Sequence, residues 1–333
     1  MKITLRTIAK DTGLSVSTVS RALSQSGKIS PKNVKKVFES AQRLNYPIYQ
    51  HAAASKFRSN FYIAVITHFH PGEFYASFFD GFARAAAGSD THFALFNVNK
   101  DTECSQRFLD SLKRNHFDAA VLFLPGLSKN DYHAILEQAG DFPVMSTAPL
   151  ATPVMDTIAF DNYSGGHLVA KHFHERGYQK IGSIQGPKTE IETHLRKNGL
   201  TDYCEQHGLD IVWSYQSDYD ITSGRQAYED FKRLRDKPEA VFAGNDALAL
   251  GFMHSAQQDG LRIPGDVALA GYDDIPSCKY QNPGLTSVHT PYVDLGKNVL
   301  ELLTAQLHNP DPHRQHSGST KLVPVTLVER GST

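Results

Sequence analysis

With 333 residues, 40% of them hydrophobic, the chain is long enough for two or three domains with substantial cores. It contains neither a run of ~18 apolar residues nor an apolar leader after Met1, which argues against a membrane-spanning or exported protein. The net charge of −1 is unevenly distributed, because residues 1–58 hold seven lysines and four arginines against Asp11 and Glu39, a net +9 that leaves about −10 on the rest.

The first predicted elements are two short helices joined by a glycine turn. Apolar residues at helical spacing give the first helix one apolar face: Leu5, Ile8 and Ala9. Thr4 is a suitable N-cap for this helix, and Ser15 is one for the second. Between them, Gly13 can take the positive φ that a tight turn between helices needs.

The second predicted helix has two different faces. Val19 and Leu23 point to one side at i, i+4 spacing. The opposite side carries small residues and one arginine: Val16, Ser17, Ser20 and Arg21. Such a face fits the major groove of DNA, where arginine pairs with guanine and small apolar groups contact thymine methyls.

A third helix is predicted after Ser30-Pro31, and its apolar positions close a small core: Val34, Val37, Phe38, Ala41 and Leu44. On helical pattern alone, an ordinary three-helix surface module explains these residues equally well. The basic charge of this segment favours phosphate binding, because a basic head on an acidic body is typical of nucleic-acid-binding proteins.

Residues 3–46 resemble the DNA-binding head of the lac repressor family of bacterial transcription regulators. The run Ser15-Val16-Ser17-Thr18-Val19-Ser20-Arg21 matches the recognition helix of that family, with Leu14 in place of its first valine. The resemblance implies a helix-turn-helix domain over 1–46 in which three residues read bases: Val16, Ser17 and Arg21. Three others would contact phosphates or fix the helix: Ser15, Thr18 and Ser20.

The same resemblance implies the partners of the head. One helix-turn-helix reads only half of a site, so double-stranded operator DNA of near-palindromic sequence and a second copy of the chain in a homodimer are expected. Residues 47–60 would form a hinge, which in the family becomes helical on DNA and inserts a leucine into the minor groove. Ala52 matches a DNA-contacting hinge position, whereas the proline–asparagine pair is broken after Pro47 and Ser55 stands where the leucine is expected.

From residue 61 onward, apolar runs typical of strands alternate with amphipathic helices. Strands are predicted at 61–66, 92–98, 119–124, 181–184, 240–243 and 267–270. Helices are predicted at 74–87, 106–115, 166–176, 195–207, 224–234 and 248–259. This alternation predicts an α/β body with parallel sheets covered by helices on both faces and a ligand site at the carboxyl ends of the strands.

The body also resembles the effector-binding core of the lac repressor family, a two-lobed fold shared with periplasmic sugar-binding proteins. Three segments carry this resemblance: Gly244-Asn245-Asp246-Ala247-Leu248-Ala249-Leu250-Gly251, Gly271-Tyr272-Asp273-Asp274, and Pro283-Gly284-Leu285-Thr286-Ser287-Val288 with Pro291. It implies an effector-binding domain over 61–333. The first lobe would comprise about 61–161 and 289–317, and the second about 162–288 and 318–333.

Six residues of the body are candidate effector contacts: Phe74, Tyr75, Asp161, Arg196, Tyr219 and Asp246. Each has a structural alternative, since the aromatic residues can pack in a core, the arginine can be solvated and the aspartates can begin helices. Tyr219 is the weaker candidate, and Trp213 is interpreted as a packed strand residue. The aromatic and carboxylate lining favours a carbohydrate effector over a purine.

Other chemistry finds little support in the sequence. His68 and His70 have no nearby cysteine or carboxylate partner, so they indicate the mouth of a cleft rather than a metal site. The three cysteines are widely spaced, as in reduced thiols of a cytoplasmic protein. No glycine-rich phosphate loop, Gly-x-Ser-x-Gly or His-Glu-x-x-His motif occurs, which disfavours an enzyme and a cofactor.

Two rival functions follow from the fold alone. A periplasmic-type sugar receptor is disfavoured by the basic head and the missing signal peptide, and an enzyme of nucleotide-like α/β fold is disfavoured by the missing motifs. The sequence therefore predicts a cytoplasmic transcription regulator, a repressor, controlled by a small carbohydrate effector.

Overall fold

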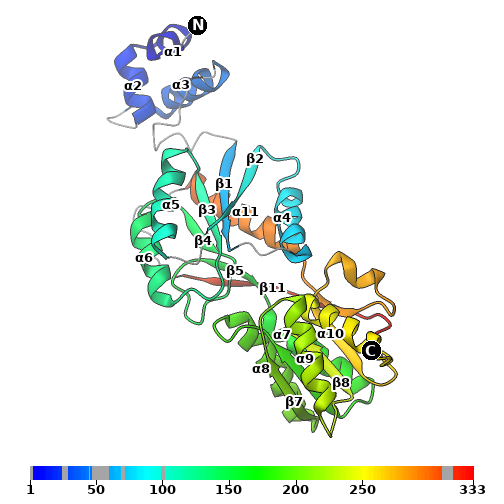
Figure 1. Ribbon diagram of the computed structural model, residues 1–333. Helices are drawn as coiled ribbons and strands as arrows, with labels where there is room; N and C mark the ends of the chain where they lie inside the picture. Colours follow the sequence, from blue (N-terminus) through cyan, green and yellow to red (C-terminus); the bar gives the residue numbers. More distant parts are fainter. Residues whose placement is uncertain are drawn as a thin grey trace.

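The computed structural model describes residues 3–24, 29–44, 46, 60–68, 72–98, 102–309 and 318–333, with the backbone alone at Ser24, Gln42 and 102–107. It contains a helical head, followed by two α/β lobes (Figure 1). The head consists of α1 (Leu5–Thr12), α2 (Val16–Ser24) and α3 (Pro31–Arg43). Ala52 and Ser55 of the predicted hinge, like His70, lie outside the described residues.

The head forms as the sequence predicts. Thr4 precedes α1 and its backbone N–H donates to the Thr7 hydroxyl over 3.2 Å, while Gly13 ends the helix at φ 67°. The three helices enclose a common apolar core: Ile8, Ala9, Val19, Ala22, Leu23, Val37, Phe38 and Ala41. Burial of these side chains fixes the rotation of α2, so that its opposite face is left to solvent.

The first lobe is a parallel sheet with strand order β11-β5-β4-β3-β1-β2. Its strands are β1 (Phe61–Thr67), β2 (Thr91–Asn97), β3 (Ala119–Phe123), β4 (Val144–Ser146), β5 (Thr157–Phe160) and β11 (Thr320–Val323). Its helices are α4 (Glu73–Ala85), α5 (Thr102–Arg114), α6 (Lys129–Ala139) and α11 (Tyr292–His308). Side chains that alternate along β1 and β3 pack against α4 and α11 on one face and against α5 and α6 on the other.

The second lobe repeats this plan with strand order β12-β10-β9-β8-β6-β7, in which only β12 pairs antiparallel within the described sheet. Its strands are β6 (Lys180–Gln185), β7 (Asp210–Gln216), β8 (Ala240–Ala243), β9 (Ala268–Asp273), β10 (Thr286–His289) and β12 (Thr326–Val328). Its helices are α7 (Asn162–Glu175), α8 (Ile191–His207), α9 (Ile221–Arg233), α10 (Asp246–Gln258) and the 3₁₀ helix η3 (Pro276–Tyr280). α7 and α8 cover one face of the sheet, and α9 and α10 cover the other.

One detail of the predicted lobe composition is wrong. The segment 318–333 was expected in the second lobe, yet β11 pairs with β5 in the first sheet, and only β12 reaches the second. The physical reason is that β5 leaves an edge of hydrogen-bonding groups, which β11 covers before the chain crosses over at Pro324. Figure 1 shows this strand in red beside the green strands of the first lobe.

Three chain segments connect the lobes: the one after β5, the one between β10 and α11, and the one between β11 and β12. A pair of hydrogen bonds also joins the two lobes. The Glu73 carboxylate at the start of α4 accepts them from the backbone N–H of Ser277 in η3, at 2.8 Å, and from the Ser277 hydroxyl. The parallel strands bring their carboxyl ends to the junction of the lobes, where the polar residues described next are found.

Candidate functional site

The exposed face of α2 is the first candidate site. Val19, Ala22 and Leu23 are buried against the other head helices. On the opposite side, Val16 is 41% exposed and lies beside the exposed Ser17 and, one turn later, Arg21. The structure therefore presents together the three residues that the sequence assigns to base reading.

The hydroxyl residues around the start of α2 have local partners. Ser15 caps the helix, because its Oγ accepts the backbone N–H of Thr18 at 3.1 Å, and it lies 2.7 Å from the Thr18 hydroxyl. Ser17 Oγ is 2.9 Å from Ser15 Oγ, and the Arg21 Nε donates to the Ser17 carbonyl at 3.2 Å. Thr18 and Ser20 are half-buried. These bonds hold the recognition face in place before any ligand is bound.

The head's acidic residue Asp11 is neutralised internally. Its Oδ2 accepts hydrogen bonds from the Ser40 hydroxyl and from Arg43, whose Nη2 lies 2.5 Å away. These two donors hold the pKa of the Asp11 carboxyl below its ordinary value, with the Ser40 bond as the larger cause. The nearby Lys36 adds a smaller electrostatic attraction to Asp11, and exposed cations such as Lys10 and Lys36 remain in position to contact DNA phosphates.

The second candidate site lies between the lobes and is centred on Arg196 in α8. This guanidinium is buried, and its Nε donates to Asn162 Oδ1 at 2.8 Å while Nη1 donates to the Gly244 carbonyl. Its central carbon lies 3.7 Å from the centre of the Tyr272 ring and 5.6 Å from that of Tyr219. The alternative of a solvated helix arginine is therefore excluded by the structure.

Asp273, at the end of β9, is a site residue that we did not predict. It is 4% exposed, and its Oδ1 lies 3.7 Å from Arg196 Nη2 without any hydrogen-bond partner. Its backbone takes a φ of 107°, which is strained for a residue with a side chain and is typical of functional sites. Burial raises the pKa of its carboxyl well above the ordinary value. The position of Asp273 after a buried strand was the signal that could have identified it.

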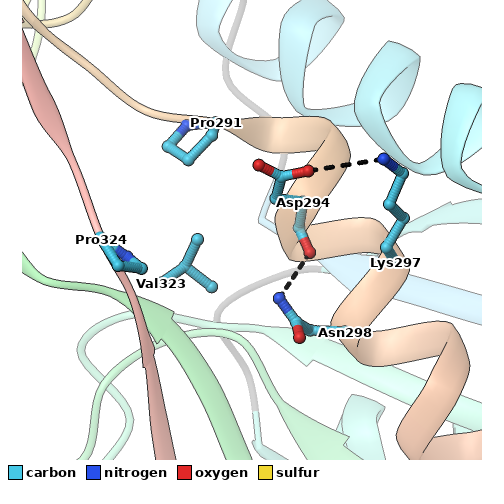
Figure 2. Close-up of a pocket in the computed structure, with 6 residues that line it drawn as sticks. All are labelled: Pro291, Asp294, Lys297, Asn298, Val323 and Pro324. Carbon is cyan, nitrogen blue, oxygen red and sulfur yellow. Dashed lines mark hydrogen bonds and ion pairs between the residues drawn. The ribbon is translucent and has the colours of Figure 1, made fainter.

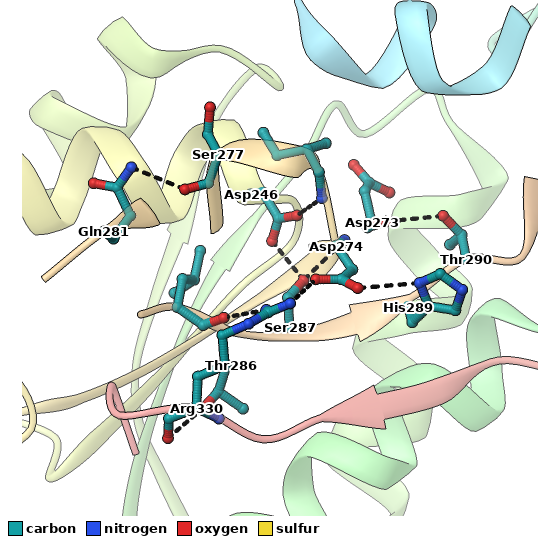
Figure 3. A network of polar contacts seen from close by, with 12 residues as sticks. Asp246, Asp273, Asp274, Ser277, Gln281, Thr286, Ser287, His289, Thr290 and Arg330 are labelled. Carbon is teal, nitrogen blue, oxygen red and sulfur yellow. Dashed lines mark hydrogen bonds and ion pairs between the residues drawn. The ribbon is translucent and has the colours of Figure 1, made fainter. Parts of the chain in front are cut away.

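Asp246 is not available as an effector contact in this structure. Asn245 rather than Asp246 caps α10, by accepting the Leu248 N–H at 2.9 Å. The Asp246 side chain is 0% exposed, and both of its oxygens are occupied, one by the Ser287 hydroxyl at 2.6 Å and the other by the Ile275 N–H at 2.9 Å (Figure 3). The sequence placed the carboxylate just after a strand, at the start of a helix, but could not show that its side chain turns inward, so this predicted contact is replaced by a structural role.

Asp161 and Tyr219, two of the predicted effector contacts, lie at the junction of the lobes. Asp161 begins α7, and its carboxylate accepts the backbone N–H of Ser164 at 3.0 Å and its hydroxyl at 2.6 Å, as expected for a cap. The Tyr219 hydroxyl is 2.9 Å from Thr193 Oγ1. An added Cβ at Gly186 would lie 2.0 Å from the Tyr219 ring, so only glycine lets this ring lie across the end of β6.

Phe74 and Tyr75 provide the aromatic wall of the first lobe. The Phe74 ring centre lies 5.6 Å from that of Phe123 and 5.9 Å from that of Tyr292, and Phe74 contacts the cores of both lobes. The Tyr75 hydroxyl donates to the His68 carbonyl at 2.8 Å. Burial raises the pKa of Tyr75 to about 12, with smaller contributions from Glu190 and other carboxylates of the second lobe.

A network of polar contacts links the Asp273 turn to the crossover (Figure 3). Arg330 Nη2 donates to Asp274 Oδ1 at 2.6 Å, and His289 Nδ1 lies 3.1 Å from Asp274 Oδ2. The Thr290 hydroxyl donates to the Asp273 carbonyl at 3.0 Å. These contacts bond the turn at Asp273 and Asp274 directly to the segment that connects β10 with α11.

A pocket of about 430 Å³ lies elsewhere, between the start of α11 and the segment that joins β11 to β12 (Figure 2). It is lined by Pro291, Asp294, Lys297, Asn298, Val323 and Pro324. Its polar groups pair with one another, since Lys297 lies 3.6 Å from the Asp294 carboxylate and the Asn298 amide donates to the Asp294 carbonyl at 2.8 Å. None of the predicted effector residues lines this pocket.

The remaining sequence candidates have structural roles or lie outside the site. Trp213 is packed in the second lobe and donates its indole N–H to Asp230 at 2.9 Å, so its interpretation as a strand residue is confirmed. Among the described residues, no group of three or more potential ligands could hold a metal ion. Likewise, no described helix is long and apolar enough to cross a membrane.

Comparison with known proteins matches the two sites to two known kinds of domain. Residues 4–47 match the model of bacterial regulatory proteins of the lacI family, and residues 170–333 match a periplasmic binding protein-like domain. The chain therefore carries a lacI-type DNA-binding domain followed by a periplasmic binding protein-like domain. The ribose operon repressor of Escherichia coli (strain K12) is 27% identical over 340 residues, which cover 99% of each chain.

Solved structures agree with the fold described above. The lac repressor dimer bound to operator and the anti-inducer ONPF has a TM-score of 0.74 at 24% identity, covering 100% of this chain and 99% of the other. The complex of the transcriptional regulator CelR with cellobiose has a TM-score of 0.72 at 23% identity, covering 99% of this chain and 100% of the other. The predicted fold, a helix-turn-helix head with a two-lobed α/β body, is confirmed.

Proposed function

We propose that this protein is a sequence-specific DNA-binding transcription repressor of the lacI family, whose operator affinity is controlled by a small carbohydrate bound between the lobes. The observation that carries the proposal is the face of α2, on which Val16, Ser17 and Arg21 are exposed together above a buried core. The repressor names of its relatives support the same activity, and none of the relatives reported above is an enzyme.

On DNA, the exposed face of α2 would enter the major groove. Arg21 offers paired donors to a guanine, and the Val16 methyl groups suit a thymine methyl. The hydroxyls of Ser15, Thr18 and Ser20, which border this face, would position the helix against the phosphate backbone. Because one head reads a half-site, a homodimer on a near-palindromic operator is proposed, with Ala52 of the hinge as a further contact.

Between the lobes, the carbohydrate would be held by charge and by aromatic rings. Arg196 and Asp273 offer a donor and an acceptor for neighbouring hydroxyl groups. Phe74, Tyr75 and Tyr219 offer apolar ring faces for the C–H side of a sugar. The cellobiose in the CelR complex and the name of the ribose operon repressor support this ligand class.

The sugar site and the DNA-binding face would be coupled because both binding equilibria depend on the arrangement of the lobes. A ligand that prefers one arrangement of the lobes shifts the population toward it, and the sugar and the operator then change each other's binding by the same coupling free energy. The three crossovers and the Glu73–Ser277 contact are the structural elements that such a shift must move.

The test is fluorescence anisotropy of the full-length protein with operator-sized fragments from its own upstream region. We expect tight binding to one near-palindromic sequence, a steep loss of affinity with rising salt because phosphates release counterions, and a change of affinity with one sugar of a panel. A flat salt response, or equal binding to every sequence, would contradict the DNA half. Operator binding that no sugar alters would contradict the carbohydrate half.

A further inference from the structure

Three polar atoms at the junction of the lobes are buried without a hydrogen-bond partner. They are Oε2 of Glu192, Oδ1 of Asp273 and the hydroxyl of Tyr272. Glu192 is 7% exposed, Asp273 4% and Tyr272 0%. Buried polar groups are nearly always paired in folded proteins, so several unpaired ones in one place indicate that a ligand supplies the missing partners.

Glu192, on the first turn of α8, faces both lobes. Its carboxylate acts electrostatically on the hydroxyls of Tyr75 in α4 and Tyr132 in α6, both in the first lobe. In its own lobe it acts on Arg196 and on the Tyr219 hydroxyl. Glu192 also lies four residues before Arg196, on the same face of α8, and no motif in the sequence had singled it out.

Acidic side chains outnumber basic ones around this position. Glu190, Glu192 and Asp273 are set against Arg196, which already donates to Asn162 and the Gly244 carbonyl and faces Asp273 at 3.7 Å. Burial, together with a smaller contribution from the neighbouring Glu190, raises the pKa of Glu192 to about 7. An anionic ligand would add repulsion in a buried, weakly screened site, whereas hydroxyl and ammonium groups would donate hydrogen bonds to these carboxylates.

We infer that the effector carries no phosphate or carboxylate group and that Glu192 is the residue that selects against sugars bearing one. The inference rests on the proposed function, because it takes a carbohydrate as the effector. Discrimination by repulsion is a general route to specificity, and it needs no additional attractive contact. The expected order of affinity is amine-bearing sugar, then neutral sugar, then sugar acid or sugar phosphate.

The experiment uses matched sets of sugars and the full-length protein. Melting-temperature shifts and calorimetry would compare D-glucose with D-glucosamine, D-glucose 6-phosphate and D-glucuronate, and likewise for D-galactose and for D-ribose with D-ribose 5-phosphate. Within the set that binds, we expect the anionic members to bind at least about tenfold more weakly than the neutral parent. Glu192→Gln should reduce this gap by about tenfold, and the control Glu205→Gln, on the exposed end of the same helix, should not.

A second readout needs no ligand. Because the pKa of Glu192 is raised from an ordinary value of 4.5 to about 7, the folded state binds its proton more tightly than the unfolded state does. Its stabilising contribution is therefore present below about pH 4.5 and is lost as the pH rises through about 7. As the pH rises through this range, the melting temperature of Glu192→Gln should increase relative to that of the wild type. The melting temperature of Glu205→Gln should show no such relative increase.

Several results would overturn the inference. An anionic sugar that binds as tightly as its neutral parent would contradict the charge selection, and an unchanged gap in Glu192→Gln would contradict the role of that residue. A panel without any binder would remove the carbohydrate effector and this inference with it. Operator binding measured in parallel would then show that the DNA half of the proposed function still holds.

Discussion

The exposed face of α2 and the junction between the lobes hold polar side chains in opposite environments. On α2, the side chains of Ser17 and Arg21 lie in solvent, and they make local hydrogen bonds with residues of the same helix or its cap. At the junction, Arg196 and Asp273 are buried, and several of their neighbours lack partners. A long ligand such as DNA can bind along a rigid, exposed helix. A small ligand binds between enclosed polar groups, which lack hydrogen-bond partners until it is bound.

Because the junction is buried, we expect the loss of the Arg196 side chain to reduce the free energy of unfolding more than any other substitution considered below. Arg196→Ala leaves Asp273, the Asn162 carbonyl oxygen and the Gly244 carbonyl buried without their donor, and breaking a buried charge pair costs about 3–5 kcal/mol. Urea unfolding of the full-length protein would measure this loss. The control Arg176→Ala removes an exposed pair with Glu329, worth about 0–1 kcal/mol. Equal losses in the two variants would refute the buried role of Arg196.

A reciprocal pair of core substitutions tests whether the head and the body fold as separate units. Leu23→Ala removes a side chain with 0% exposure from the head and should cost about 2–5 kcal/mol there, abolishing operator binding. Sugar binding by the body should persist, as shown by calorimetry. Leu269→Ala in the second lobe should have the opposite outcome. If either variant lost both activities, the separation of the two regions would be wrong.

Asp246→Ala distinguishes a structural carboxylate from an effector contact. The substitution leaves the Ser287 hydroxyl and the Ile275 N–H buried without an acceptor, which should cost about 1–3 kcal/mol of stability. Thermal unfolding would show the loss, while calorimetry on the folded variant should show sugar affinity close to that of the wild type. Loss of sugar affinity at full stability would instead assign Asp246 to the ligand.

The smallest expected change in stability belongs to the head surface. Arg21→Ala should leave the melting temperature unchanged, because the side chain is exposed, but should cost about 1–3 kcal/mol of binding to the preferred operator. Lys36→Ala is the matched control, since an exposed lysine that meets phosphate should weaken binding to all sequences alike. Anisotropy titrations on specific and unrelated DNA would separate the two. Uniform weakening by Arg21→Ala would refute base reading.

The sequence by itself determined the head and the class of the body. The residues of the α2 face are neighbours in sequence, so helical periodicity alone places Val16, Ser17 and Arg21 on one side and Val19 and Leu23 on the other. Alternating strands and helices likewise predicted parallel sheets, because apolar runs and amphipathic helices are local patterns. These features depend on contacts within a few residues.

The tertiary structure decided which side chains meet between the lobes. Arg196 and Asp273 are far apart in the chain, and they approach only because α8 begins and β9 ends at the same junction. The inward turn of Asp246 and the return of β11 to the first sheet depend on contacts equally remote in sequence. Long-range packing sets these positions, and local residue patterns carry no record of it.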